Sequence, residues 1–287
     1  MKTRHPILSV FVLVASVFMA TQLAFAQQYQ IIYPNGKMAV SERPLPAPVY
    51  EAQKHMLVVE GEFFSRNNRS QILFRVWQTG FVDAKSGYIV SARHGLVETA
   101  MTLLGRYNLD YGIDNQGILQ GMDYEYRFYA SILAATKEAS IKKYPLSVIA
   151  MGSMGTDNDV IVFKSTEQIP VRGLEISGIA TVGETAYFSG TTRSSMHFHD
   201  ADGEQFNVIF QNLKFNVEGI VLSIFENVTS SKIKKTYLLS RPVKEGFSGG
   251  PVLNKAGKVI AMGIATDELF SYAISSEDIL AVINSIK

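Results

Sequence analysis

The sequence contains no cysteine among its 287 residues. Disulfides, thiol nucleophiles, cysteine-ligated zinc and iron–sulfur clusters are therefore excluded. It also lacks an excess of either charge, since 27 Lys and Arg stand against 26 Asp and Glu, so the composition gives no reason to expect nucleic acid as a partner. Charged residues make up 18% and hydrophobic residues 47%, which is typical of a globular chain and not of a disordered one.

The N-terminus has the pattern of a targeting segment. Lys2 and Arg4 precede an apolar run from Ile7 to Ala20, and the tripeptide Ala24-Phe25-Ala26 follows it. A basic start, an apolar centre and an A-x-A end describe a secretory signal peptide. We therefore expect residues 1–26 to be cleaved, the mature protein to be periplasmic or secreted, and no membrane attachment to remain. An uncleaved anchor is the alternative, although the run is short for a membrane-spanning helix.

The rest of the chain divides at about residue 55. Residues 27–55 are interpreted as a Pro-rich arm or linker, because Pro44-Leu45-Pro46-Ala47-Pro48 is typical of extended polyproline. From Met56 onward, short apolar and β-branched runs are separated by turns, which indicates an all-β barrel or sandwich. These runs are 56–64, 72–77, 80–83, 87–91, 160–163, 184–188, 206–210, 219–224, 252–254 and 259–262. Residues 56–287 are thus expected to form the folded domain.

Two segments are predicted to be helical. Tyr129 to Lys143 is rich in Ala and Lys. Near the C-terminus, Ser275 or Ser276 can cap a helix that begins at Glu277. In that helix four apolar residues share one face, namely Ile279, Val282, Ile283 and Ile286.

Three motifs follow one another along the predicted domain. They are Gly80-Phe81-Val82 with Gly87-Tyr88-Ile89-Val90-Ser91-Ala92-Arg93-His94, then Asp159-Val160-Ile161-Val162-Phe163-Lys164, then Gly246-Phe247-Ser248-Gly249-Gly250-Pro251-Val252. Together they resemble the trypsin-like serine proteases, especially the exported bacterial Deg/HtrA-like branch, here without a PDZ domain. The resemblance covers roughly residues 56–287. It implies an all-β fold of two six-stranded Greek-key barrels of the chymotrypsin type with a short C-terminal helix. It also implies a serine endopeptidase that acts on protein or peptide substrates.

The resemblance assigns roles that chemistry explains. A serine hydroxyl is a weak nucleophile near neutral pH, so it needs an imidazole base, and a buried carboxylate holds that imidazole in one tautomer. By resemblance His94 is the general base, Asp159 its orienting carboxylate and Ser248 the nucleophile. Asp157 is a local alternative to Asp159. The oxyanion hole is assigned to the N–H groups of Gly246 and Ser248, in a loop whose tight backbone favours glycine.

Substrate-binding residues are assigned in the same way. The segment Ile264-Ala265-Thr266 is expected to offer a strand edge to an extended peptide, and the Thr266 hydroxyl to hydrogen-bond the triad carboxylate. Pro242, or Arg241 if the alignment shifts by one residue, stands where family members that cleave after basic residues have an acid. We therefore expect a preference for small or medium apolar side chains. No cofactor and no metal are expected, since His197 and His199 alternate without an evident third ligand.

Several residues depart from the family pattern. Arg93 precedes the histidine, and Gly95 follows it without a side chain to support the imidazole. Phe247 precedes Ser248 and cannot pair with a newly cut N-terminus. Residues 95–158 are expected to form loops near the first barrel. These departures leave an inactive protease-fold module that binds extended peptides as the alternative function, with a small-ester esterase as a third. The sequence does not indicate the oligomeric state.

Overall fold

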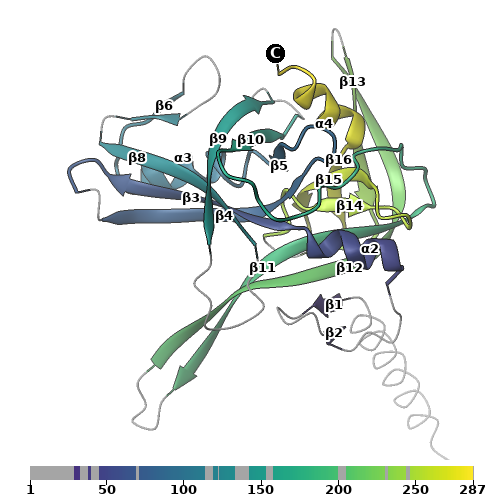
Figure 1. Ribbon diagram of the computed structural model, residues 1–287, viewed down its shortest axis with the longest axis horizontal. Helices are drawn as coiled ribbons and strands as arrows, with labels where there is room; N and C mark the ends of the chain where they lie inside the picture. Colours follow the sequence, from purple (N-terminus) through teal and green to yellow (C-terminus); the bar gives the residue numbers. More distant parts are fainter. Residues whose placement is uncertain are drawn as a thin grey trace, which may run out of the picture.

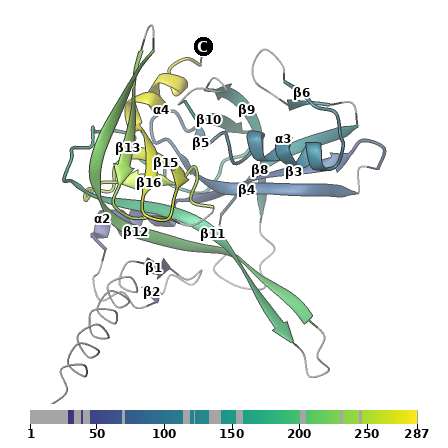
Figure 2. The same ribbon diagram turned by 180° about the vertical axis from the view of Figure 1, so that it is seen from behind.

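Figures 1 and 2 show the computed structural model, in which two β-barrels lie side by side with short helices at their surface. The structure describes residues 29–32, 38–39, 45–68, 71–113, 119–121, 123–132, 142–152, 158–199, 205–229, 232–243 and 246–286. The predicted signal peptide lies outside these residues. Within them, no helix is long and apolar enough to cross a membrane.

The first barrel is closed and antiparallel, with the order β10-β5-β4-β3-β8-β9. Its strands are β3 (Leu57–Ser65), β4 (Ile72–Val82), β5 (Ile89–Ser91), β8 (Tyr124–Ile132), β9 (Lys143–Met151) and β10 (Ile161–Ser165). Helix α3 (Val97–Arg106) and the small pair β6 (Gly112–Ile113) and β7 (Leu119–Gln120) lie between β5 and β8 in the chain. Alternate residues of β3, such as Leu57, Val59 and Phe63, are fully buried and fill the barrel.

The second barrel has the order β11-β14-β15-β16-β13-β12, and the pairing of β11 with β12 closes it. Its strands are β11 (Thr185–His199), β12 (Gln205–Thr229), β13 (Lys232–Leu239), β14 (Pro251–Leu253), β15 (Val259–Thr266) and β16 (Ser271–Ser275). Strand β1 (Tyr29–Ile32) adds to β12, and β2 (Met38–Ala39) adds to β1. The far ends of β11 and β12 project from the body as a long hairpin (Figures 1 and 2).

Both barrels share one connectivity. When the six strands of each are numbered along the chain, the order around either barrel is 3-2-1-4-5-6. The predicted fold of two six-stranded Greek-key barrels is therefore confirmed.

An apolar layer joins the two barrels. Phe81, Val90 and Val162 of the first barrel are buried in one cluster with Tyr187 and Met262 of the second. Two helices complete this layer, α2 (Ala47–Lys54) and α4 (Ser276–Ile283). The C-terminal helix was predicted, and the Ser275 hydroxyl accepts a hydrogen bond from the Asp278 N–H as its N-terminal cap.

Two predictions about the first half of the chain are wrong. Tyr129 to Ile132 ends strand β8 and Lys143 begins β9, so all described residues of the predicted 129–143 helix except Lys142 are in strands. Residues 133–141 lie outside the described residues. Pairing with β3 and β9 overrides the helix propensity of this segment. Residues 95–158 are more than loops, because they supply β8, β9 and α3.

The predicted extended arm also contains a helix. Pro46 precedes α2 and Pro48 lies in its first turn, where a missing N–H costs no hydrogen bond. Val49 and Ala52, three residues apart, are buried in the layer between the barrels. Since helices can start with proline, the Pro-rich pattern did not distinguish this helix from extended polyproline.

Candidate active site

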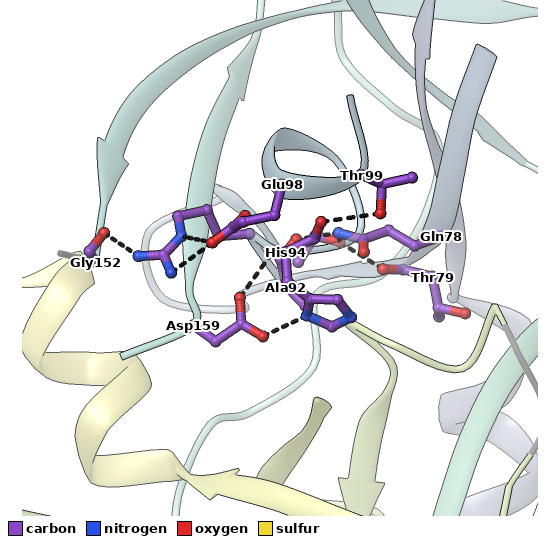
Figure 3. Close-up of polar contacts among 10 residues, drawn as sticks. Gln78, Thr79, Ala92, His94, Glu98, Thr99, Gly152 and Asp159 are labelled. Carbon is purple, nitrogen blue, oxygen red and sulfur yellow. Dashed lines mark hydrogen bonds and ion pairs between the residues drawn. The ribbon is translucent and has the colours of Figure 1, made fainter. Parts of the chain in front are cut away.

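His94 and Asp159 come together because their strands are neighbours. Strand β5 ends three residues before His94, and β10 begins two residues after Asp159. The two strands pair antiparallel, with Ser91 opposite Ile161, so the segments that carry the two side chains lie side by side. The His94 N–H donates to Asp159 Oδ1 at 2.8 Å, and the ring Nδ1 hydrogen-bonds to Oδ2 (Figure 3).

The environment makes this imidazole a stronger base. Burial disfavours its charged form and lowers the pKa of His94. The hydrogen bond and the negative charge of Asp159, together with the charge of Glu98, outweigh that effect, so the pKa is raised above its usual value. The Asp159 side chain is 13% exposed and that of His94 36%, so the carboxylate is sheltered while the ring is open to a substrate.

Gln78 supports the segment that carries the histidine. Gln78 is buried, with only 1% of its surface exposed. Its amide nitrogen donates to Ser91 Oγ at 2.7 Å and to the Ala92 carbonyl. A Cβ on Gly95 would overlap the amide oxygen of Gln78. Because Gly95 has no side chain, Gln78 of β4 has room to lie against this segment. Gln78 thus supplies the support that the residue after His94 does not.

The loop that carries Ser248 is pressed against the first barrel. Gly246 and Gly249 have φ values of +92° and +79°, which glycine adopts without strain. A Cβ on Gly249 would overlap the Thr79 carbonyl and come within 2.5 Å of Ser91 Oγ. The loop therefore sits on the ends of β4 and β5, close to the segment that leads to the histidine.

Thr79 makes the hydrogen bonds at this junction. Its N–H lies 3.1 Å from both the Gly246 and the Ser248 carbonyl, and its hydroxyl donates to the Gly246 carbonyl at 2.7 Å. The same hydroxyl accepts from the Thr191 N–H at 2.8 Å on β11. One fully buried residue thus ties the nucleophile loop to strands of both barrels.

Phe247 anchors the same loop from the other side. It is 1% exposed, belongs to the core of the second barrel, and its ring centroid lies 5.7 Å from that of Phe188. A Cβ on Gly190 would overlap the Phe247 ring, so the ring fills the space above that glycine. The residue before Ser248 is therefore held by apolar packing.

The three predicted catalytic residues lie at one junction, but only two of them are hydrogen-bonded to each other. His94 and Asp159 are hydrogen-bonded directly. Ser248 is half-buried in the adjacent loop, and in the described part of the chain no hydrogen bond joins its hydroxyl to His94. The alternative carboxylate, Asp157, lies outside the described residues.

The predicted substrate edge is present, but one of its expected bonds is not. Strand β15 pairs with β14 as far as Met262 and with β16 as far as Thr266. The opposite edge of residues 264–266 therefore has no strand partner among the described residues. The Thr266 hydroxyl accepts from the Val243 N–H at 3.1 Å and donates to the Phe270 carbonyl at 3.0 Å. Among the described residues the expected bond to Asp159 is absent, and the hydroxyl is instead engaged by these two partners. Pro242 is half-buried beside Val243.

No metal site accompanies these residues. The described residues contain no group of three or more His, Asp or Glu side chains arranged to hold a metal ion.

Sequence reasoning missed Gln78, Thr79 and Arg93. The first two stand directly before the Gly80 motif, but nothing in the pattern indicates their partners. Helix α3 had a readable signal, since Val97, Ala100 and Leu104 repeat at helical spacing and are buried.

No protein-family model matches the sequence, and no curated protein is similar to it. Solved structures do match. The chain resembles the active form of the Rv3671c protease from M. tuberculosis, with 12% identity over 86% of this chain and 92% of that chain and a TM-score of 0.50. It also matches the HtrA-type protease AlgW with decapeptide, with 14% identity over 83% of this chain and 66% of that one and a TM-score of 0.47. At such identity the likeness shows the fold, and the chain has the two-barrel fold of the trypsin-like serine proteases.

Proposed function

We propose that this chain is a serine endopeptidase that uses His94, Asp159 and Ser248. The observation that carries the proposal is the two-point contact of Asp159 with His94, through the backbone N–H and through the ring Nδ1. This contact leaves Nε2 as the free ring nitrogen and holds the ring in the tautomer that a base requires. A merely structural histidine would not need both bonds, a partly exposed ring and a raised pKa.

The proposed reaction is acyl transfer. The Ser248 oxygen attacks the peptide carbonyl carbon while its proton passes to Nε2 of His94. The N–H groups of Gly246 and Ser248 stabilise the oxyanion, and the protonated imidazole then gives its proton to the leaving amine. Water hydrolyses the acyl-enzyme by the same proton route. The Asp159 carboxylate stabilises the imidazolium.

The substrate is proposed to be an extended peptide. The unpaired edge of residues 264–266 can accept it by strand addition, in which main-chain hydrogen bonds give affinity that depends little on sequence. The absence of an acid at Pro242 supports a preference for small or medium apolar side chains.

The test is protein turnover together with covalent labelling. The mature 27–287 form should digest casein and react with an organophosphonate probe, and Ser248→Ala should abolish both. Ser165→Ala, at the opposite end of β10 from Asp159, is the matched control and should retain both. Activity that survives Ser248→Ala would refute the assignment.

An inactive peptide-binding module is the second candidate. It is favoured by one observation, that no hydrogen bond joins Ser248 to His94 among the described residues. Catalytic hydrogen bonds are often long before substrate binds, so this geometry is also compatible with an enzyme. If the wild type and Ser248→Ala bind an extended peptide equally and neither cleaves it, the second candidate is correct.

We also propose that the protein is exported and that its mature form begins at Gln27. The basic and apolar pattern of residues 1–26 supports this. N-terminal sequencing of the protein recovered from a periplasmic fraction tests it, and a chain that still begins at Met1 would argue for the anchor.

A further inference from the structure

Arg93 is a buried cation next to the proposed base. It directly precedes His94, yet it is only 4% exposed. A buried guanidinium is costly unless its N–H groups are satisfied. Its Nε donates to Glu98 Oε1 at 2.8 Å, its Nη2 lies 2.7 Å from the same oxygen, and its Nη1 donates to the Gly152 carbonyl at 2.7 Å. Figure 3 labels the two partners, Glu98 and Gly152, together with His94 and Asp159.

One anchor belongs to the segment that follows His94, and the other lies next to the segment that carries Asp159. Glu98 is in the first turn of α3, and that turn also holds the histidine, because Thr99 donates from its N–H to the His94 carbonyl at 3.0 Å. Gly152 follows β9 and donates to the Val160 carbonyl at 2.8 Å, next to Asp159. The guanidinium therefore connects the segment of the base to the segment of its carboxylate.

We propose that Arg93 is a positioning residue for His94, a clamp that holds the base and the Asp159 carboxylate at hydrogen-bonding distance. This inference rests on the proposed function. Glu98 and the Gly152 carbonyl are its two attachment points, and Arg93 touches neither substrate nor the reacting atoms. A planar group with several donors can reach both points at once, which a lysine ammonium on a flexible chain cannot do as well.

The charges of the clamp give it a signature. Three charged groups in the described part of the chain act on His94: Asp159 before β10, Glu98 on α3 and Arg93 itself. Asp159 and Glu98 raise the pKa of His94, whereas Arg93 lowers it. Removing the Arg93 charge alone would raise that pKa, but releasing the clamp would loosen the hydrogen bond from Asp159, which is the largest cause that raises it. A clamp therefore predicts a lower pKa without Arg93, whereas a nearby charge with no positioning role predicts a higher one.

The experiment measures His94 and the reaction separately. NMR titration of the imidazole in the Ser248→Ala background reports the pKa without requiring activity. The same substitutions in the active protein give kcat/KM against pH. Arg93→Met should lower the pKa, move the acidic limb of the profile to lower pH and lower kcat/KM by about 10- to 100-fold, as expected when a base is displaced from its carboxylate. Glu98→Gln keeps an acceptor for Arg93 and removes a charge that raises the pKa, so it should lower the pKa with a smaller loss of kcat/KM.

Arg93→Lys is the conservative control. It keeps the charge, so the pKa should stay close to that of the wild type, while kcat/KM should recover only in part because one attachment is lost. It and Glu98→Gln keep the proposal testable if Arg93→Met does not fold. A pKa that rises in Arg93→Met, or does not change, would overturn the clamp. A wild type without peptidase activity would instead overturn the proposed function, and the titration would still decide the role of Arg93.

Discussion

The hydroxyl of Thr79 should contribute to stability well beyond its size. Replacing it by valine keeps the shape but removes a group that donates to the Gly246 carbonyl at 2.7 Å and accepts from the Thr191 N–H at 2.8 Å. Both contacts join different parts of the molecule, since Thr79 lies 112 residues from Thr191 and 167 from Gly246. No water can easily replace the hydroxyl, because Thr79 is fully buried.

The size of the effect follows from what each partner loses. The Thr191 N–H is left buried without its acceptor, which costs roughly 1–3 kcal/mol. The Gly246 carbonyl loses one of two donors and keeps the Thr79 N–H, at a cost of about 1 kcal/mol. Thr79→Val should therefore destabilise the fold by about 2–4 kcal/mol. Thr79→Ser keeps the hydroxyl and loses one methyl group, for about 1 kcal/mol.

Urea unfolding measures both variants. Trp77 is the only tryptophan and lies on β4 two residues before Thr79, so its fluorescence reports on this junction. We expect Thr79→Val also to lower kcat/KM by about 10-fold, because the displaced Gly246 is proposed to donate to the oxyanion. Equal unfolding free energies for Thr79→Val and Thr79→Ser would refute the reasoning.

Three further predictions concern the same site. Gly95→Ala should destabilise the protein by about 1–3 kcal/mol, because the added methyl group would overlap the Gln78 amide. In thermal unfolding, the double variant Gly95→Ala with Gln78→Ala should lose less stability than the sum of the losses of the two single variants. Phe247→Ala should cost roughly 3–5 kcal/mol and slow organophosphonate labelling, with Phe247→Leu in between; labelling at the wild-type rate would contradict its role as the anchor of the loop. Because the pKa of His94 is raised, kcat/KM should fall as pH drops through that value. The stability contributed by the His94–Asp159 pair should be complete below the unfolded imidazole pKa and decline as pH rises through the folded one. Urea midpoints between about pH 5 and 9 test this against Asp159→Asn, in which the decline should be absent because burial then lowers the imidazole pKa.

The three motifs could be recognised in the sequence because their signals are local. The glycines around Ser248 and the apolar strands beside His94 and Asp159 depend on the backbone within a few residues. The helix predicted at 129–143 was wrong because its signal was only local. The Ala and Lys content favours a helix, but pairing with β3 and β9 makes the described part of the segment strand. Helix α2 was not predicted because proline is compatible both with the start of a helix and with an extended arm.

The supporting contacts could not be predicted from the pattern. Gln78 occupies the space left by Gly95, and Arg93 reaches Gly152, which is 59 residues away. Thr266 shows the same limit, since its hydroxyl was assigned to the carboxylate of Asp159 and instead bonds to Val243 and Phe270. A side chain's partner depends on where the barrels place distant segments, and a one- or two-residue difference along a strand changes which atoms meet.

By itself, the sequence determined the strand-rich fold class, the order of the three motifs, the capped C-terminal helix and the identity of the proposed base, carboxylate and nucleophile. The fold class and the helix follow from composition, periodicity and short-range backbone preference, whereas the three proposed residues follow from the resemblance of the motifs to the trypsin-like serine proteases. Only the tertiary structure decided which polar groups satisfy one another at the junction of the two barrels, how the histidine is buttressed without a neighbouring side chain, and why an arginine can be buried beside it. Those outcomes depend on closing two barrels and packing them together, and no local stretch of chain contains that information.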